Sequence, residues 1–229
     1  MEPLEVVAMP DPRQRPGRFD ALVGGLHATP ATVAYGPTLR CINGELSPLG
    51  SRALLGVPAG ELASRVVGLT EVLGRPGDEL VERLSTAATW SRRFAILDKV
   101  LARRLTAPVA APASEVREAW QRLLRTGGHT PVAGIADEVG WSRRHLGERF
   151  RAELGLTPKV AARVIRFDRA AHLLERPERP ALADVAARCG YSDQAHLTRE
   201  WRSFAGAPPA RWLAAEQLSN VQTAPWGPC

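Results

Sequence analysis

Residues 139–158, VGWSRRHLGERFRAELGLTP, hold a dense group of side chains that could do chemistry, because they carry four arginines. Guanidinium groups donate paired hydrogen bonds to carboxylates, phosphates and guanine edges. Within the same stretch, Leu146, Phe150 and Leu154 recur every fourth residue, as on a helix that packs one face on a core. The pattern therefore predicts a helix whose charged face is either an ordinary solvated surface or a surface for an anionic partner.

The cysteines and histidines have no spacing that predicts catalysis or metal binding. Cys41, Cys189 and Cys229 lie far apart without a CxxC pair, and the five histidines form no HExxH motif. We therefore expect no catalytic residue, no metal site and no cofactor. Cys189 is expected to be a small buried residue, and Cys41 lacks a visible base that would activate its thiol.

Composition favours a soluble globular protein with an anionic partner. The 229 residues are 45% hydrophobic and 24% charged, with a net charge of +6. Residues 114–213 carry 17 Lys and Arg against 12 Asp and Glu, so most of the basic surplus lies there. No signal-peptide pattern and no long apolar run is visible, which predicts a cytoplasmic protein without a membrane partner.

The proline- and alanine-rich segment 106–113 is expected to be a linker. It would separate an α+β region, residues 1–105, from a helical region, residues 114–213, which a flexible tail at 214–229 follows. In the first region we expect a loose segment at 1–20, strands at 31–35 and 38–46, and helices at 51–56 and from Pro58. Two strands cannot close a core, so this region is either a small cap on the helical region or an incomplete domain, which we favour.

A long helix is also predicted from Trp90 to Leu105. Its apolar residues are spaced by four, three, four and four, namely Trp90, Phe94, Leu97, Leu101 and Leu105. This stripe would pack inside the N-terminal region or pair with a second copy of the chain, and internal packing is the favoured interpretation.

Helix-start signals recur after the linker. Ser114 is expected to cap the next helix, and Thr130 and Thr157 each precede a proline that suits the first helical position. The helix that Thr157 caps should run over residues 158–175.

A repeat lies on both sides of that helix. AGIADEVGWSRRHLGERFRAELGLTP and ADVAARCGYSDQAHLTREWRSFAGAPP share Ile/Val-Ala, Gly-aromatic-Ser and His-Leu, followed by an aromatic residue, a glycine and a proline at equal distances from the histidine. Each copy is a short helix, a tight turn at glycine and a second helix. This order predicts two helix-turn-helix units, at about 130–156 and 181–207.

Projection at about 100° per residue gives each second helix an outward arc opposite its apolar residues. In the first copy the arc holds Arg144, Gly147, Glu148 and Arg151; in the second it holds Ala195, Thr198, Arg199 and Arg202, with Gln194 at its edge. Arginine, glutamine, threonine and alanine are side chains that contact base edges in DNA. His145 and His196 point sideways, so a packing role is favoured over phosphate contact.

The helix between the two copies has a suitable length for a spacer. Eighteen residues at ~1.5 Å each make a rod of ~27 Å. Major-groove windows on one face of DNA recur every ~34 Å, a distance that the rod and its flanking turns can span.

Residues 114–213 resemble the DNA-binding domain of AraC/XylS-family transcription regulators. The motifs that carry the resemblance are IADEVGWSRRHLGERFRAELGLTP and VAARCGYSDQAHLTREWRSFAGAPPARW. The resemblance implies double-stranded DNA as partner, two adjacent major grooves as the site, and base contacts from Arg144, Gly147, Glu148, Gln194, Ala195, Thr198 and Arg199. Arg143, Arg151 and Arg202 would hold phosphates.

The resemblance also implies a regulatory N-terminal domain, commonly a cupin-type β-barrel, of which residues 1–105 show only fragments. RNA polymerase, a small-molecule effector and a second copy of the chain are the further partners it suggests. Two positions depart from the family pattern: Glu148 stands where arginine is frequent, and Gly147 removes a side chain from the reading face.

The expected fold is mainly α, with an all-α tandem helix-turn-helix domain after a small α+β region. The expected function is sequence-specific transcription regulation, without enzymatic activity. The alternatives are an alkyl-transfer repair enzyme that uses Cys41 and carries this DNA-binding domain, and a protein-interaction module that no longer binds DNA. Substitution of Cys41 would separate the enzyme from a regulator.

Overall fold

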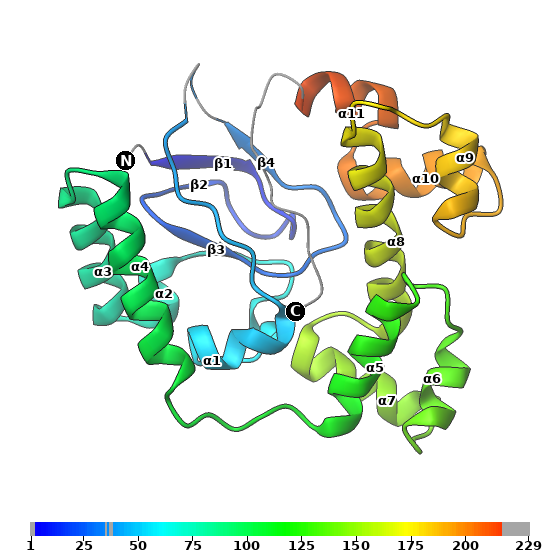
Figure 1. The fold of residues 1–229 in the computed structure, drawn as a ribbon, viewed down its shortest axis with the longest axis horizontal. Coiled ribbons are helices and arrows are strands. Elements are labelled where there is room, and N and C mark those ends of the chain that lie inside the picture. Colours follow the sequence, from blue (N-terminus) through cyan, green and yellow to red (C-terminus); the bar gives the residue numbers. More distant parts are fainter. Residues whose placement is uncertain (1–2, 35, 37–38, 217–229) are drawn as a thin grey trace.

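The computed structural model describes residues 3–34, 36 and 39–216. The chain forms a small α+β region followed by an all-helical region, and the two lie side by side (Figure 1). Helices dominate, as the sequence predicts. Residues 106–113 contain no helix or strand and connect the two regions.

The N-terminal region contains two small sheets. One has the strand order β2-β1-β4 and the other pairs β3 with β5, all antiparallel. The strands are β1 Leu4–Ala8, β2 Gly17–Phe19, β3 Leu22–Gly24, β4 Thr32–Ala34 and β5 Val66–Gly68. In the described residues these sheets remain separate and do not close into a barrel.

Several predictions for this region were wrong. The described part of residues 1–20 is not loose, because β1 pairs with both β2 and β4. β4 confirms part of the first expected strand, whose Tyr35 lies outside the described residues. The second expected strand is absent from residues 39–46. The helix expected from Pro58 is a short 3-10 helix, η2 Ala59–Leu62, after which the chain extends into β5.

The remaining N-terminal elements are helical. They are η1 Pro48–Gly50, α1 Ser51–Leu55, α2 Leu69–Leu73, α3 Arg75–Thr86 and α4 Trp90–Leu105. The predicted helices at 51–56 and from Trp90 are confirmed.

The predicted apolar stripe of α4 is not its buried face. Trp90, Phe94 and Leu105 are 41%, 50% and 60% exposed. Ile96 is buried instead and packs with Val100 against α3. The internal packing expected for the whole stripe is therefore wrong for three of its residues.

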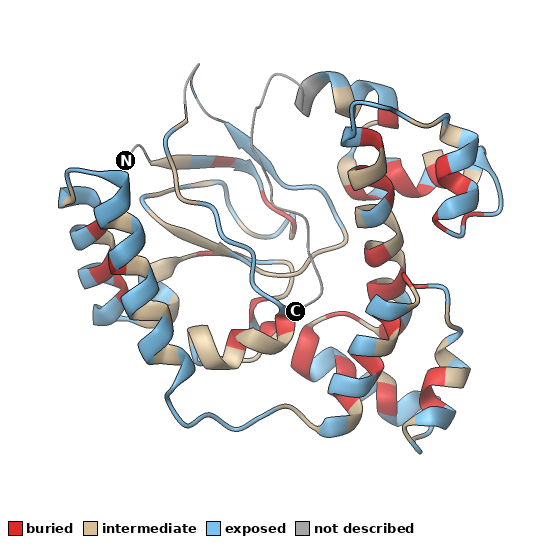
Figure 2. Ribbon diagram, viewed as in Figure 1, coloured by how far each residue is buried: buried red, intermediate tan, exposed pale blue. Residues whose placement is uncertain are grey.

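The helical region is built around α8 Pro158–Glu175, with one group of helices at each end (Figure 1). The first group is α5 Ser114–Arg125, α6 Val132–Glu138 and α7 Arg143–Leu154; the second is α9 Leu182–Arg188, α10 Gln194–Ala205 and α11 Pro209–Glu216. Each group closes its own core against α8, so buried residues follow that helix along its length (Figure 2). We call α6 with α7 the first unit, and α9 with α10 the second unit.

The helix starts test the capping predictions. Thr157 caps α8 as expected, because its hydroxyl accepts a hydrogen bond from the amide of Val160. Ser114 does not cap α5; its hydroxyl donates to Glu115 inside the first turn. Thr130 does not cap α6 either, since Pro131 occupies the N-cap position. At the other end, α11 includes residues 214–216 of the expected tail, and residues 217–229 lie outside the described residues.

Candidate nucleic-acid interface

The two units have the same local construction. Each turn contains a glycine in the left-handed region, Gly140 at φ +71° and Gly190 at φ +73°. Such a φ is strained for residues with a Cβ atom. The second helix of each unit then starts at a side-chain cap: Ser142 accepts from the amide of His145 at 3.2 Å, and Asp193 accepts from that of His196 at 2.6 Å.

The inward faces of α7 and α10 also match. Leu146 and Phe150 in α7, and Leu197 and Trp201 in α10, are fully buried. The histidine of each unit packs edge-on against the aromatic residue of its turn, His145 on Trp141 and His196 on Tyr191. These contacts confirm the expected cores and show both histidines in packing contacts. With these residues inside, the opposite arcs of both helices face outward.

The outward arc of α7 is basic, but one of its arginines forms an ion pair with a glutamate on the same arc. Arg143, Arg144, Glu148 and Arg151 are exposed. Arg144 Nε lies 2.9 Å from Glu148 Oε1, and this hydrogen bond raises the pKa of the Arg144 guanidinium. A Cβ atom at Gly147 would meet nothing within 4 Å. The packing inside the chain therefore does not require glycine at this position.

The outward arc of α10 has no acidic member. Gln194, Ala195, Arg199 and Arg202 are exposed and Thr198 is half-buried. The Thr198 hydroxyl donates to the carbonyl of Gln194 at 2.9 Å, within the helix. Hydrogen bonds from the amide of His196 lower the pKa of the capping Asp193, which keeps a carboxylate at the start of α10. All ten predicted site residues thus lie on α7 or α10, five on each.

Sequence reasoning missed a contact between the N-terminal region and α7. Arg52 of α1 holds the buried Glu153 near the end of α7, with Nε–Oε1 at 2.6 Å and Nη2–Oε2 at 2.8 Å. The backbones also touch, since a Cβ atom at Gly60 would stand 2.2 Å from the carbonyl oxygen of Ala152. A signal was available: in the repeat, Glu153 aligns with the apolar Phe204, and a charge at a core position needs a partner.

The same reasoning missed a buried carboxylate on α10. Glu200 is 9% exposed and pairs with arginines of α8. In the repeat it aligns with Arg149, which is exposed. At this position of the repeat, α10 thus has a buried carboxylate and α7 an exposed guanidinium.

The cysteines are free in the described part of the chain. Cys189 is fully buried, as expected, and burial raises the pKa of its thiol. Cys41 is half-buried. Among the described residues no group of three or more His, Cys, Asp or Glu could hold a metal ion. In the same residues, none of the helices has the length and apolar character needed to cross a lipid bilayer.

Comparison with known proteins identifies the helical region. A family model described as a helix-turn-helix domain matches residues 135–215. The transcriptional regulator YbfI of Bacillus subtilis is 38% identical over 63 residues, which are 28% of this chain and 22% of that protein. The HTH-type transcriptional activator RhaS of Escherichia coli is 35% identical over 68 residues, 30% of this chain and 24% of that protein. The chain thus spans under a quarter of the length of these relatives.

Two solved structures are similar as well. The C-terminal domain of AraT, a response regulator from Geobacillus stearothermophilus, is 21% identical and covers 52% of this chain and 95% of its own, with a TM-score of 0.43. The DNA-binding domain of the global transcriptional factor AdpA, solved with a target DNA, is 27% identical and covers 48% of this chain and 100% of its own, also with a TM-score of 0.43.

The family model matches a region that begins inside α6 and contains α7, α9 and α10. Residues 135–215 therefore form a helix-turn-helix domain.

Proposed function

We propose that this chain is a sequence-specific regulator of transcription that binds double-stranded DNA through α7 and α10. The observation that carries the proposal is the pair of matched, exposed arcs at the two ends of α8. The family model over residues 135–215 and the names of the relatives, both HTH-type transcriptional regulators, support it. Most of the chain's positive charge surplus lies in this region, which favours a polyanion.

We call α7 and α10 the recognition helices; each would enter one major groove, on the same face of the duplex. The 18 residues of α8 give a rod of ~27 Å, and the turns at its ends add to the reach. Successive grooves are ~34 Å apart, so both helices could bind at once. Two simultaneous contacts bind more tightly than either alone, because the second becomes intramolecular.

The arcs divide into base-reading and phosphate-binding residues. Arg144, Gln194, Thr198 and Arg199 have donors that suit guanine, adenine or either base, and Ala195 can contact a thymine methyl group. Arg143, Arg151 and Arg202 lie at positions suited to phosphates, together with the amides at the helix starts. Glu148 would pair with Arg144 and repel nearby phosphates, while Gly147 would let the backbone of α7 approach the bases.

RNA polymerase, a small-molecule effector and a second copy of the chain are further partners that we propose for the whole protein. They come from the resemblance to the family, and DNA binding as proposed above requires none of them.

Selection of bound duplexes from a random DNA pool by the intact chain tests the function. We expect one enriched sequence with two half-motifs about one helical turn apart, and an affinity that falls steeply as salt rises. Retention of duplexes without an enriched sequence would contradict specific recognition. Retention of no duplex at any salt concentration would contradict DNA binding altogether and favour a protein-interaction module.

A further inference from the structure

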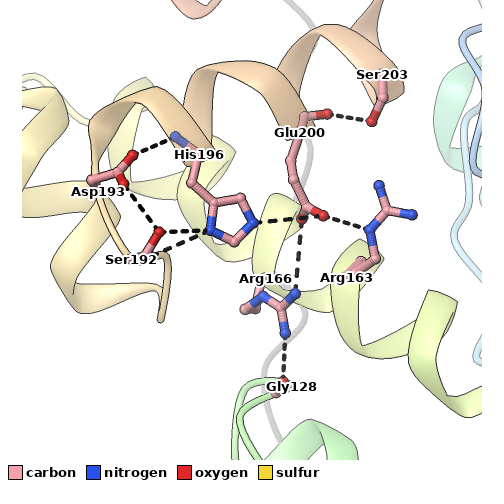
Figure 3. A network of polar contacts seen from close by, with 8 residues as sticks. All are labelled: Gly128, Arg163, Arg166, Ser192, Asp193, His196, Glu200 and Ser203. Carbon is pink, nitrogen blue, oxygen red and sulfur yellow. Dashed lines mark hydrogen bonds and ion pairs between the residues drawn. The ribbon is translucent and has the colours of Figure 1, made fainter.

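Glu200 is on the second recognition helix, but its carboxylate points away from the outward arc toward α8 (Figure 3). Its Oε1 lies 2.5 Å from Nε of Arg163, and its Oε2 lies 3.8 Å from Nη2 of Arg166. Both arginines are on α8, and the Glu200 side chain is 11% exposed. A buried carboxylate is tolerated when cations compensate it. The two arginines therefore fix the orientation of α10 about its own axis relative to α8.

Arg166 continues the network into the other half of the domain. Its Nη1 donates to the carbonyl oxygen of Gly128 at 2.9 Å (Figure 3). Gly128 lies in the turn between α5 and α6, and a Cβ atom there would stand 2.3 Å from the carbonyl oxygen of Ala162 on α8. A continuous chain of contacts therefore joins the turn that leads into the first unit to the recognition helix of the second.

A second contact joins the same two places without using Glu200. Gly190 forms the turn between α9 and α10, and His129 follows Gly128 in the turn between α5 and α6. A Cβ atom at Gly190 would lie 2.1 Å from Nε2 of His129. The two turns thus touch directly, so the two units are connected by contacts other than those with α8.

We propose that Glu200, through Arg166, is a positioning residue that sets the orientation of α10 relative to α7. It would thereby set which spacing between two half-motifs the chain accepts. This inference rests on the proposed two-groove function for its effect on DNA. If α7 and α10 are held rigidly, simultaneous binding raises the DNA affinity only at the matching spacing. If their relative orientation is loose, several spacings are tolerated and the affinity rises less at each of them.

The repeat supports this assignment. The residue of α7 that aligns with Glu200 is Arg149, which is exposed. The helix-turn-helix construction itself therefore does not require a carboxylate at this position. Of the two copies, only α10 has a carboxylate at this position.

The test compares Glu200→Gln with Glu138→Gln in the intact chain. The first change keeps the shape and removes the charge that faces α8. The control breaks the pair between Arg122 Nη2 and Glu138 Oε1, 2.9 Å apart, which holds the first unit to α5 and does not link the two units. If Glu200→Gln does not fold, as judged by circular dichroism, Arg166→Gln replaces it, because that change cuts the link to Gly128 while leaving Arg163 on Glu200.

The DNA readout uses the selected duplex and versions whose half-motifs are moved apart or together by about one or two base pairs from the spacing of ~10. For the unchanged chain and the control we expect the affinity to fall at least about tenfold at the altered spacings. For Glu200→Gln we expect weaker binding at the selected spacing and a much flatter profile, with unchanged affinity for a duplex that carries only the half-motif of α7. A spacing profile equal to that of the unchanged chain would overturn the proposal.

A second readout needs no DNA. Spin labels at Arg149→Cys on α7 and Ser203→Cys on α10, in a chain with Cys41 and Cys229 changed to Ser, report the distance between the two helices. We expect a narrow distance distribution for the parent and for Glu138→Gln, and a broader or shifted one for Glu200→Gln. An unchanged distribution would overturn the positioning role. If the unchanged chain binds no DNA, the proposed function fails while this measurement still decides the role of Glu200.

Discussion

The two recognition helices share a construction but are held in place by different neighbours. α7 is tied near its end to the N-terminal region, through Glu153 and Arg52. α10 is tied to α8 through Glu200, Arg163 and Arg166, and Arg166 also binds the turn that precedes the first unit. Neither carboxylate has a counterpart in the other copy. The repeat thus defines the two outward arcs, and residues outside its shared pattern connect each arc to the rest of the molecule.

The outward arcs differ as well. α7 places Glu148 beside Arg144 and lacks a side chain at Gly147, whereas α10 presents Arg199 and Arg202 without an acidic residue on the arc. A carboxylate on the outward arc repels phosphates, and it forms an ion pair with an arginine that could otherwise bind DNA. We therefore expect the second unit to contribute more to affinity and the first to be more selective about its sequence.

The largest effect should come from Arg199→Ala. Loss of an arginine that reads a base should weaken binding to the selected duplex by ~1–3 kcal/mol and relax specificity at one position of the second half-motif. Arg211→Ala is the matched control, because Arg211 is exposed on α11 outside both arcs. Titrations against the duplex and its single-base variants measure both effects, and equal affinities for Arg199→Ala and the unchanged chain would remove Arg199 from the site.

The second-largest effect is expected for Arg52→Ala, on the free energy of unfolding. It leaves Glu153 buried without its cation, and the two side chains are only 31% and 12% exposed. We expect the free energy of unfolding to drop by about 1–2 kcal/mol, between the values for surface and buried pairs. Arg75→Ala breaks an exposed pair with Glu79 and should have little effect. Urea denaturation compares them; similar small losses would mean that the contact does not hold α7.

Glu148→Gln should tighten binding. Removing this charge frees Arg144 and reduces repulsion of phosphates, so affinity should rise about threefold to tenfold at low salt, with less gain as salt increases. Glu118→Gln removes the same charge from the exposed face of α5 and serves as the control. A loss of affinity confined to one base position would instead show that Glu148 reads a base.

Gly147→Ala should have the smallest effect. The position lies inside α7 and has open space for a Cβ atom, so alanine should raise the free energy of unfolding by about 0.5–1 kcal/mol. Gly134→Ala in α6 should give a similar gain away from the arc. Both are measured by urea denaturation and by DNA titration. We expect DNA affinity to fall only for Gly147→Ala, and unchanged affinity would show that the α7 backbone does not approach the bases closely.

Local signals were sufficient for the second half of the fold. The cap at Thr157, the turn glycines and the cores around Phe150 and Trp201 were predicted, because helix capping and periodicity act between near neighbours in sequence. Ser114 shows the limit, since its hydroxyl had an alternative partner in Glu115. The three-residue strands of the N-terminal region leave almost no periodic signal, and β3 pairs with β5, which lies far from it in the chain.

The two outward arcs of the candidate site were predictable from the sequence, but the ion pairs that hold α7 and α10 in place were not. The spacing of Arg144 and Arg199 on their helices follows from helical geometry alone. The partners of Glu153 and Glu200 come from α1 and α8, and only the three-dimensional arrangement brings them within reach. Comparing the repeat copies position by position shows which charges lack a counterpart, although it does not say what they bind.

Missing-base interference on the selected duplex, with the intact chain, tests whether α7 and α10 bind two major grooves at once. This experiment finds the bases whose removal weakens binding. We expect two clusters of such bases on one face of the duplex, with centres about 10 base pairs apart, and loss of a contact in only one cluster for Arg199→Ala. A single cluster, or two on opposite faces, would contradict simultaneous reading by α7 and α10.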